Sequence, residues 1–270
     1  MRERQDRPLY AVGDIHGHRD ELVAALRETG LVDDAGDWTG QDVDLWFMGD
    51  FVDRGPDGIG VIDLVMRLAE QARESAGTVD SVLGNHEVLM LGYHRFGDTS
   101  DATGLHSFGL SWLRNGGQES DQAGLTDEHI EWLRTRPAVT RQGEHLLMHA
   151  DTTGYLDWGA TIDEINATVA GQLTGDDLDQ WFTVWRTMTA RHAFRDNHGQ
   201  AEAERMLGVL GGEQIVHGHS IIAEWLGVDP KAITGPMPYA GDRVLGIDGG
   251  LYDGGPCLVV ELPYADPAAS

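Results

Sequence analysis

Short apolar runs in the first third of the chain each stop at a glycine, and an acidic or amide residue follows at once. Three runs show this pattern: Leu9 to Gly13, Leu45 to Gly49 and Val79 to Gly84. We predict buried β-strands there, because short apolar runs bounded by turn residues are typical of strands covered on both faces. Between them, Arg19 to Thr29 and Asp57 to Arg73 carry apolar residues at helical spacing. This alternation predicts an α/β sheet, in which ligands bind beyond the carboxyl ends of the strands.

The middle of the chain has fewer strand patterns. Leu105 to Arg114 and Thr126 to Arg136 are predicted helices, and Pro137 stops the second one. We interpret residues 92–142 as a helical insertion, and we expect a further helical stretch from Thr161 to Arg191. Further strands are expected at His145 to His149, Gln214 to Val216, Val244 to Ile247 and Leu258 to Leu262. Because the sequence shows no linker or repeat, we expect residues 1–270 to form a single domain.

Charge and composition limit the classes of partner. The formal net charge is −26, from 45 acidic and 19 basic residues. Nucleic acids and anionic membranes are polyanions, so we expect neither as a partner. The sequence contains no apolar stretch of membrane-spanning length, and its short charged start lacks the apolar region of a signal peptide, so we expect a cytoplasmic protein. The single cysteine, Cys257, lies in an apolar run and is interpreted as a small packed side chain. The oligomeric state is left open.

Five polar segments that follow predicted strands contain residue types that bind metal ions. They are Gly13-Asp14-Ile15-His16-Gly17, Gly49 to Gly55, Gly84-Asn85-His86-Glu87, His149-Ala150-Asp151 and His217-Gly218-His219. Each motif alone is weak, because an aspartate after a strand is often a helix cap and a strand histidine is often a core residue. Phosphate ester hydrolysis needs a nucleophile and charge neutralisation, and two cations about 3.5–4 Å apart supply both. Mixed imidazole, carboxylate and amide ligands suit manganese, iron or zinc better than calcium. The five segments together therefore favour a two-metal phosphoesterase.

Three of these segments match family motifs without a change. The motifs GDxHG, GDxVDRG and GNHE are present as Gly13 to Gly17, Gly49 to Gly55 and Gly84 to Glu87. The chain thus resembles the calcineurin-like metallophosphatases and, within them, the phosphoprotein phosphatases, closest to the bacterial and Shewanella-like members. The resemblance extends from Tyr10 to about Leu262. It implies the calcineurin-like metallophosphatase fold, an α/β fold of two packed mixed β-sheets flanked by helices.

The resemblance also implies a metal-binding role for each matching position. Two divalent ions per chain, with manganese as our choice and iron or zinc as alternatives, would be bound by Asp14, His16, Asp50, Asn85, His149 and His219. Asp14 and His16 would bind the first ion, and Asp50 would bridge to the second, which the remaining residues complete. His217 is left open between a residue that supports a ligand and a packed core residue.

The catalytic roles follow from the same resemblance. His86 would donate a proton to the leaving oxygen, and Asp53 would orient it; such a donor contributes roughly 10²–10⁴ in rate. Arg54 would grip the phosphate with its planar guanidinium, and Asn85 would contact the phosphate as well. The implied nucleophile is a hydroxide that bridges the metal ions, without a covalent enzyme intermediate.

Two features depart from the family pattern. The eukaryotic phosphatases carry a Ser-Ala-Pro-Asn-Tyr-Cys segment near the end, whereas this sequence reads Gly246-Ile247-Asp248-Gly249-Gly250. A second phosphate-binding arginine is also expected, but its position is ambiguous. Arg186, which follows an aromatic run, is our choice, and Arg191 and Arg195 are the alternatives.

The sequence therefore favours a metal-dependent phosphatase that hydrolyses phosphate monoesters, with a phosphoserine or phosphothreonine protein or a small phosphoester as substrate. A dinucleoside polyphosphate hydrolase, such as a diadenosine tetraphosphatase, is the alternative, because its motifs are nearly the same. The intact Val52-Asp53-Arg54 favours the monoesterase, whereas the insertion can build either a nucleotide pocket or a peptide groove. An inactive phosphate-sensing module is disfavoured, because every expected position is filled.

Overall fold

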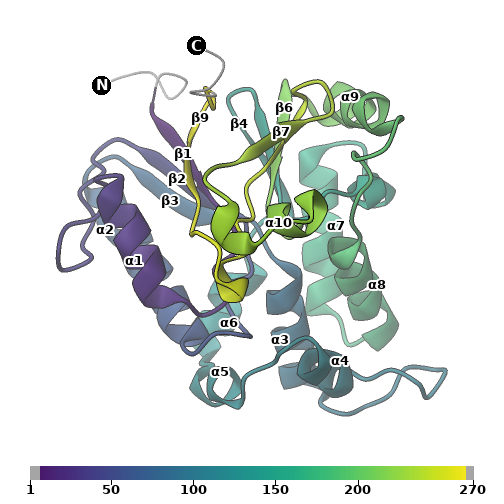
Figure 1. Cartoon of the computed structure of the whole chain (residues 1–270). Coiled ribbons are helices and arrows are strands. Elements are labelled where there is room, and N and C mark those ends of the chain that lie inside the picture. Colours follow the sequence, from purple (N-terminus) through teal and green to yellow (C-terminus); the bar gives the residue numbers. More distant parts are fainter. Residues whose placement is uncertain (1–6, 266–270) are drawn as a thin grey trace.

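The computed structural model describes residues 7–265, and its strands form two mixed sheets (Figure 1). The first sheet has the order β3-β2-β1-β9, with β1 (Leu9–Val12), β2 (Asp44–Phe47), β3 (Thr78–Ser81) and β9 (Val259–Leu262). The second has the order β4-β5-β6-β8-β7, with β4 (Val139–Gln142), β5 (His145–Met148), β6 (Gln214–His217), β7 (Met237–Tyr239) and β8 (Val244–Gly246). The central strands of each sheet are parallel, whereas β9, β4 and β7 pair antiparallel at the edges.

Both faces of the sheets are buried, because successive strand residues point to opposite sides. In β2, Leu45 and Phe47 belong to the large core cluster that includes the apolar faces of the helices. Trp46, between them, belongs to a second cluster that also contains Ala11 of β1 and Leu147 of β5. Since this second cluster draws on strands of both sheets, it is the layer in which the sheets pack against each other.

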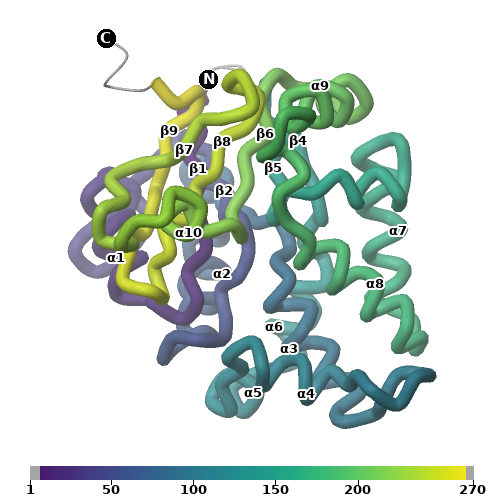
Figure 2. The backbone as a smooth tube through the Cα atoms, turned by 45° about the vertical axis from the view of Figure 1, so that its right-hand side comes forward, coloured from purple at the N-terminus to yellow at the C-terminus, as the bar shows by residue number. Residues whose placement is uncertain are grey.

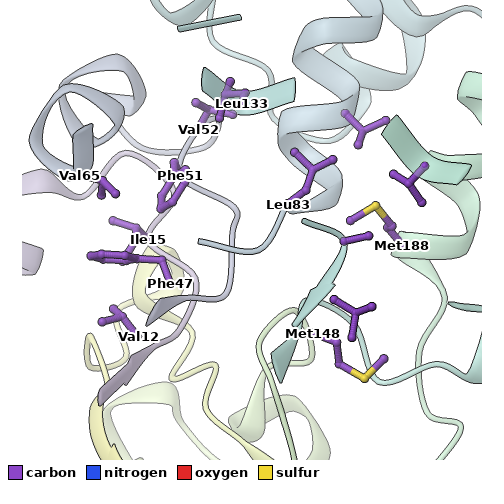
Figure 3. Packing of buried hydrophobic residues seen from close by; sticks show 14 of the residues in the cluster. Val12, Ile15, Phe47, Phe51, Val52, Val65, Leu83, Leu133, Met148 and Met188 are labelled. Atoms are coloured by element: carbon purple, nitrogen blue, oxygen red, sulfur yellow. The ribbon is translucent and has the colours of Figure 1, made fainter. Parts of the chain in front are cut away.

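Helices cover the outer faces of the two sheets. Figure 2 shows α1 (Arg19–Glu28) and α2 (Gly58–Glu74) beside the first sheet, and α7 (Ile162–Thr174), α8 (Leu178–Thr189) and α9 (Gly199–Leu210) beyond the second. In Figure 3, Phe47 and Phe51 lie toward Val65 of α2, while Leu83, Met148 and Met188 gather on the other side of the view. The predicted fold class, two mixed sheets flanked by helices, is therefore confirmed.

A further group of helices lies at the end of the sheets away from the chain termini (Figure 1). It comprises α3 (Asn85–Phe96), α4 (Phe108–Arg114), α5 (Glu119–Gly124) and α6 (Asp127–Arg134). The expected insertion boundaries need correction, because residue 92 lies inside α3 and residues 139–142 form β4. Gly92 does not break α3; a Cβ atom there would lie 2.3 Å from the ring of Phe108, so glycine lets α4 pack closely.

Other differences from the sequence predictions have local causes. The expected helical stretch from Thr161 to Arg191 is two helices, α7 and α8, which separate at Gly175, and the second ends at Thr189. The structure also contains three elements that were not predicted from the sequence: α9, the short helix α10 (Ile222–Leu226) and β7. Among residues 7–265, no helix combines the length and apolar composition needed to cross a membrane. A single domain over residues 1–270 stays a prediction.

Candidate metal centre

The predicted ligands come from five separate strand ends and meet in one buried place. Asp14 and His16 follow β1, Asp50 follows β2, and Asn85 begins α3 after β3. His149 and His219 follow the neighbouring parallel strands β5 and β6 of the second sheet. Each of these six side chains belongs to a residue that is at most 5% exposed. The carboxyl ends of both sheets therefore supply the same site.

Asp50 is shared between two groups of possible ligand atoms. One group contains Asp14, Asp50, His149 and His219, and the other contains His16, Asp50 and His86; within each group the atoms lie within 4.8 Å of one another. The shared position of Asp50 is the one that a bridging carboxylate needs. Two details differ from the expected arrangement: Asp14 is grouped with the histidines of the second sheet, and His86 lies at ligand distance from His16.

Lone pairs converge around His149. Its Nδ1 atom lies 2.6 Å from the carbonyl oxygen of Met48, which can only accept a hydrogen bond, so Nδ1 carries the proton. Burial lowers the pKa of His149, so the ring is neutral and Nε2 is unprotonated. That atom lies 2.8 Å from Oδ1 of Asn85 and 3.4 Å from Oδ1 of Asp50. Three acceptors at this separation fit a shared cation.

The other two histidines also present an imidazole in the form that binds metals. His16 donates from Nδ1 to the carbonyl oxygen of Val52 at 2.9 Å, and burial together with nearby His86 holds its pKa well below the usual range. Burial and His149 lower the pKa of His219 in the same way. Neutral imidazoles are the ligating form, so these pKa shifts favour divalent ions over protons at the site.

Three buried carboxylates need a compensating charge at this site. Burial, with the charges of Asp248 and Asp50, raises the pKa of Asp14 well above its usual value. Burial also raises the pKa of Asp248 to about 6, and Asp50 adds to that effect. Asp248 lies in the segment that departs from the eukaryotic motif, and it was not among the predicted site residues. Carboxylates, neutral imidazoles and one amide oxygen form a donor set that fits two divalent transition-metal ions.

Backbone strain concentrates at the same strand ends. Five site residues have positive φ angles between 48° and 66°, a region that side-chain-bearing residues rarely adopt: His16, Asp50, Asp53, Arg54 and His219. Gly49 precedes one of them at φ 87°, and a Cβ atom there would lie 2.5 Å from the backbone nitrogen of Gly84. Gly49 thus permits the close approach of the segments that follow β2 and β3.

The predicted proton donor lies between a carboxylate and a guanidinium. Nδ1 of His86 is 2.7 Å from Oδ2 of Asp53, and its Nε2 is 3.2 Å from Nη2 of Arg54. Burial alone would lower the pKa of His86, but the carboxylates of Asp50 and Asp53 outweigh it, so the pKa is raised. The Arg54 guanidinium also stacks 4.0 Å from the ring centre of Tyr252. The three expected catalytic residues therefore form one contact group beside Asp50.

The structure separates the three candidate arginines. Arg186 and Arg191 are both exposed, but the guanidinium of Arg186 packs on Phe182 and lies 4.0 Å from Asp101, on the insertion side of α8. Arg191 instead reaches the ligand cluster, with Nε 2.9 Å from Nε2 of His219. Thus Arg191, an alternative in the prediction from sequence, is the arginine that lies against a predicted metal ligand, and Arg186 is not.

The third arginine, Arg195, is half-buried and contacts the buried carboxylate of Asp151. Nε of Arg195 lies 3.5 Å from Oδ2 of Asp151, and the same oxygen accepts the backbone N–H of His192 at 3.0 Å. His217 joins this region through a 2.7 Å contact between its Nε2 and the hydroxyl of Tyr239. These residues hold the loop after α8, so they support the position of Arg191.

The sequence profile of the calcineurin-like phosphoesterases matches residues 7–222. The chain belongs to this family. The predicted resemblance to calcineurin-like metallophosphoesterases is thereby confirmed. The clustered ligand residues all fall within the matched range.

Two curated relatives resemble the chain over short segments. Shewanella-like protein phosphatase 2 of Arabidopsis thaliana is 30% identical over 91 residues, which are 33% of this chain and 23% of the plant protein. The symmetrical bis(5'-nucleosyl)-tetraphosphatase of Enterobacter sp. (strain 638) is 40% identical over 83 residues, 30% of this chain and 24% of the enzyme. The matched segments thus span less than a quarter of either relative's length.

Solved structures with the same fold cover nearly the whole chain. The cold-active protein-tyrosine phosphatase of a psychrophilic Shewanella species superposes with a TM-score of 0.71 at 22% identity, over 95% of this chain and 75% of that one. A protein serine/threonine phosphatase from Saccharomyces cerevisiae superposes with a TM-score of 0.56 at 16% identity, over 90% of this chain and 67% of that one. These similarities establish the fold.

Proposed function

We propose that this calcineurin-like phosphoesterase is a metal-dependent phosphatase that hydrolyses phosphate monoesters, with phosphoserine or phosphothreonine proteins as substrates. One observation carries the proposal. His86 faces the Arg54 guanidinium with Nε2 and the buried Asp53 carboxylate with Nδ1, beside the shared ligand Asp50. A positioned proton donor matters most for an alkoxide leaving group, which a serine or threonine ester releases.

Each residue has a separate task in this proposal. Asp14, His16, Asp50, Asn85, His149 and His219 hold two divalent ions, with manganese as our choice and iron or zinc as alternatives. When bound, the ions neutralise phosphoryl charge and lower the pKa of water. Arg54 and Arg191 hold the non-bridging phosphoryl oxygens, because a guanidinium pairs with two oxygens in its plane. His86 gives the proton to the leaving oxygen, and Asp53 orients its ring.

A second candidate function is the hydrolysis of dinucleoside polyphosphates such as diadenosine tetraphosphate. It is favoured by the segment that is 40% identical to a symmetrical bis(5'-nucleosyl)-tetraphosphatase. The two functions differ in the leaving group, since a nucleotide phosphate leaves as a stabilised anion and needs little protonation. A phosphatase that prefers phosphoserine or phosphothreonine should therefore depend strongly on His86, whereas a dinucleoside polyphosphate hydrolase should depend on it little.

The test measures how fast the purified protein, supplied with manganese, hydrolyses different substrates. Phosphoserine, phosphothreonine and phosphotyrosine peptides, nitrophenyl phosphate and diadenosine tetraphosphate are assayed for kcat/KM. We expect the phosphoserine and phosphothreonine peptides to be hydrolysed best. A higher kcat/KM for diadenosine tetraphosphate would replace the proposal with the second candidate, and a preference for phosphotyrosine would change the substrate class. No phosphate release from any compound would refute the enzymatic function.

The role of His86 is tested with the His86→Ala variant. We expect kcat on a phosphoserine peptide to fall by about 10²–10⁴, with a much smaller loss on nitrophenyl phosphate, whose leaving group needs little protonation. Metal content, measured by mass spectrometry, should stay near two ions per chain. Equal losses on both substrates would contradict the proton-donor role.

A further inference from the structure

Two residues from the helices between α3 and β4 contact Asp53, whose buried carboxylate lies beside His86. Nε1 of Trp112, on α4, donates to Oδ1 of Asp53 at 2.8 Å. Asp121, on α5, accepts the backbone N–H of Asp53 with Oδ2 at 2.9 Å. All three residues are buried, at 4% exposure or less. Helices that looked like a substrate-binding insertion therefore contact the catalytic pair directly.

Trp112 fixes the rotation of the Asp53 carboxylate. An indole N–H can only donate, so it holds Oδ1, and the other oxygen then faces Nδ1 of His86 at 2.7 Å. In the proposed function the transferable proton is on Nε2 of His86, which lies 3.2 Å from Nη2 of Arg54. Nδ1–H of His86 then donates to Asp53. The ring orientation thus depends on Asp53, and the orientation of Asp53 depends on Trp112.

The indole is itself held in place by its neighbours. Its ring stacks on Tyr93 of α3, with centroids 4.7 Å apart and planes 19° apart. On Gly117, a Cβ atom would lie 2.2 Å from the Trp112 ring, so only glycine allows this close approach. Trp112 therefore has one well-defined position, which a residue that orients a carboxylate requires.

The backbone of the same turn depends on the same helices. Asp53 and Arg54 both have positive φ, at 66° and 65°. The carbonyl oxygen of Gly116 accepts the N–H of Arg54 at 2.8 Å, while Asp121 holds the N–H of Asp53 and, at 3.2 Å, that of Gly58. Two consecutive strained residues persist only when surrounding contacts hold them. The insertion supplies those contacts.

We propose that Trp112 is a positioning residue for proton transfer, acting through Asp53 on His86. The inference rests on the proposed function, in which His86 protonates the leaving oxygen. A ring that can rotate away from the leaving oxygen slows only the step in which the proton moves. Substrate binding, which depends on arginines and metal ions, is not changed.

The kinetic test uses Trp112→Phe, which keeps the stacked ring and removes the N–H donor. We expect kcat on a phosphoserine peptide to fall about 10-fold with KM unchanged, and activity on nitrophenyl phosphate to stay within about twofold. Trp46→Phe is the matched control, because Trp46 is 5% exposed and its Nε1 has no hydrogen-bond partner among residues 7–265. Trp46→Phe should show neither change. An equal loss on both substrates would indicate a merely structural role for Trp112 and overturn the inference.

A spectroscopic measurement on the intact protein tests the same bond without turnover. In wild-type protein, the indole Nε1–H resonance of Trp112 should exchange slowly with solvent and shift when Asp53 is replaced in Asp53→Asn. Fast exchange, or no shift, would overturn the inference. The proposed function and this inference can fail separately. If His86→Ala loses equal activity on the phosphoserine peptide and on nitrophenyl phosphate, the proton-donor role is refuted. If His86→Ala loses activity mainly on the peptide but Trp112→Phe keeps wild-type activity, only the positioning role is refuted.

Discussion

Glu87 holds the loop that carries Asp50. Its Oε2 atom accepts the backbone N–H of Asp50 at 2.8 Å, and its Oε1 atom accepts that of Phe51 at 2.7 Å. Oε2 also accepts the N–H of Gly84 at 3.0 Å, which joins the ends of β2 and β3. Glu87 is fully buried and belongs to the GNHE motif, yet it was not among the predicted site residues. Its role is to position the shared ligand.

The first prediction follows from these three bonds. Glu87→Ala leaves three buried N–H groups without an acceptor, so we expect the free energy of unfolding to fall by on the order of 3 kcal/mol. Urea denaturation of the metal-free protein measures this change. Glu70→Ala, an exposed position on α2, is the control and should stay within about 0.5 kcal/mol of wild type. An equal effect of both substitutions would contradict the role of Glu87.

The second prediction concerns the metal ions. We expect a chelator to abolish phosphatase activity and manganese to restore it, because the ligand cluster contains buried carboxylates and neutral imidazoles that need cations. Asp50→Asn should be the most damaging ligand substitution, since it removes the charge common to both groups. Asp20→Asn, at an exposed residue of α1, is the control. Full turnover by metal-stripped protein would eliminate the two-metal proposal.

The third prediction distinguishes the candidate phosphate-binding arginines. Arg191→Ala should raise KM for phosphate esters and weaken inhibition by inorganic phosphate about 10-fold or more, because Arg191 reaches His219 in the cluster. Arg186→Ala should leave both constants near wild type, since its guanidinium faces Asp101. Steady-state kinetics with added phosphate measure both variants. The reverse pattern would return the role to Arg186.

The fourth prediction concerns the cysteine. Burial, with a smaller effect of the Glu21 charge, raises the pKa of the Cys257 thiol to about 12. Little thiolate is then present at pH 8, so alkylation by iodoacetamide should be on the order of 10²-fold slower than for an ordinary thiol. Mass spectrometry follows the reaction in native and in urea-unfolded protein. Rapid alkylation of the native protein would show that the thiol is a reactive one.

The sequence predicted the parts of the site that depend on adjacent residues. An apolar run that ends in glycine and then aspartate marks a strand end whichever sheet it joins, so possible ligands at the strand ends were expected from the motifs, and the family resemblance implied the shared role of Asp50. The family match and the two sheets confirm the metallophosphoesterase and its fold. The predicted start of the helical insertion was inaccurate, because Gly92 does not separate two elements. It lies inside α3, where it allows Phe108 to pack closely.

Only the tertiary structure decided which distant side chains meet at these strand ends. Local pattern favoured Arg186, but helix α8 directs it away, and the loop held by Asp151 brings Arg191 to His219. Likewise, nothing near Trp112 in sequence indicates that its indole contacts Asp53, 59 residues away. Strands, helix caps and glycine turns depend on neighbouring residues, so they can be predicted from sequence. Contacts between distant residues, such as Trp112 and Asp53, depend on the paths of loops and the packing of helices, which leave no periodic pattern in the sequence.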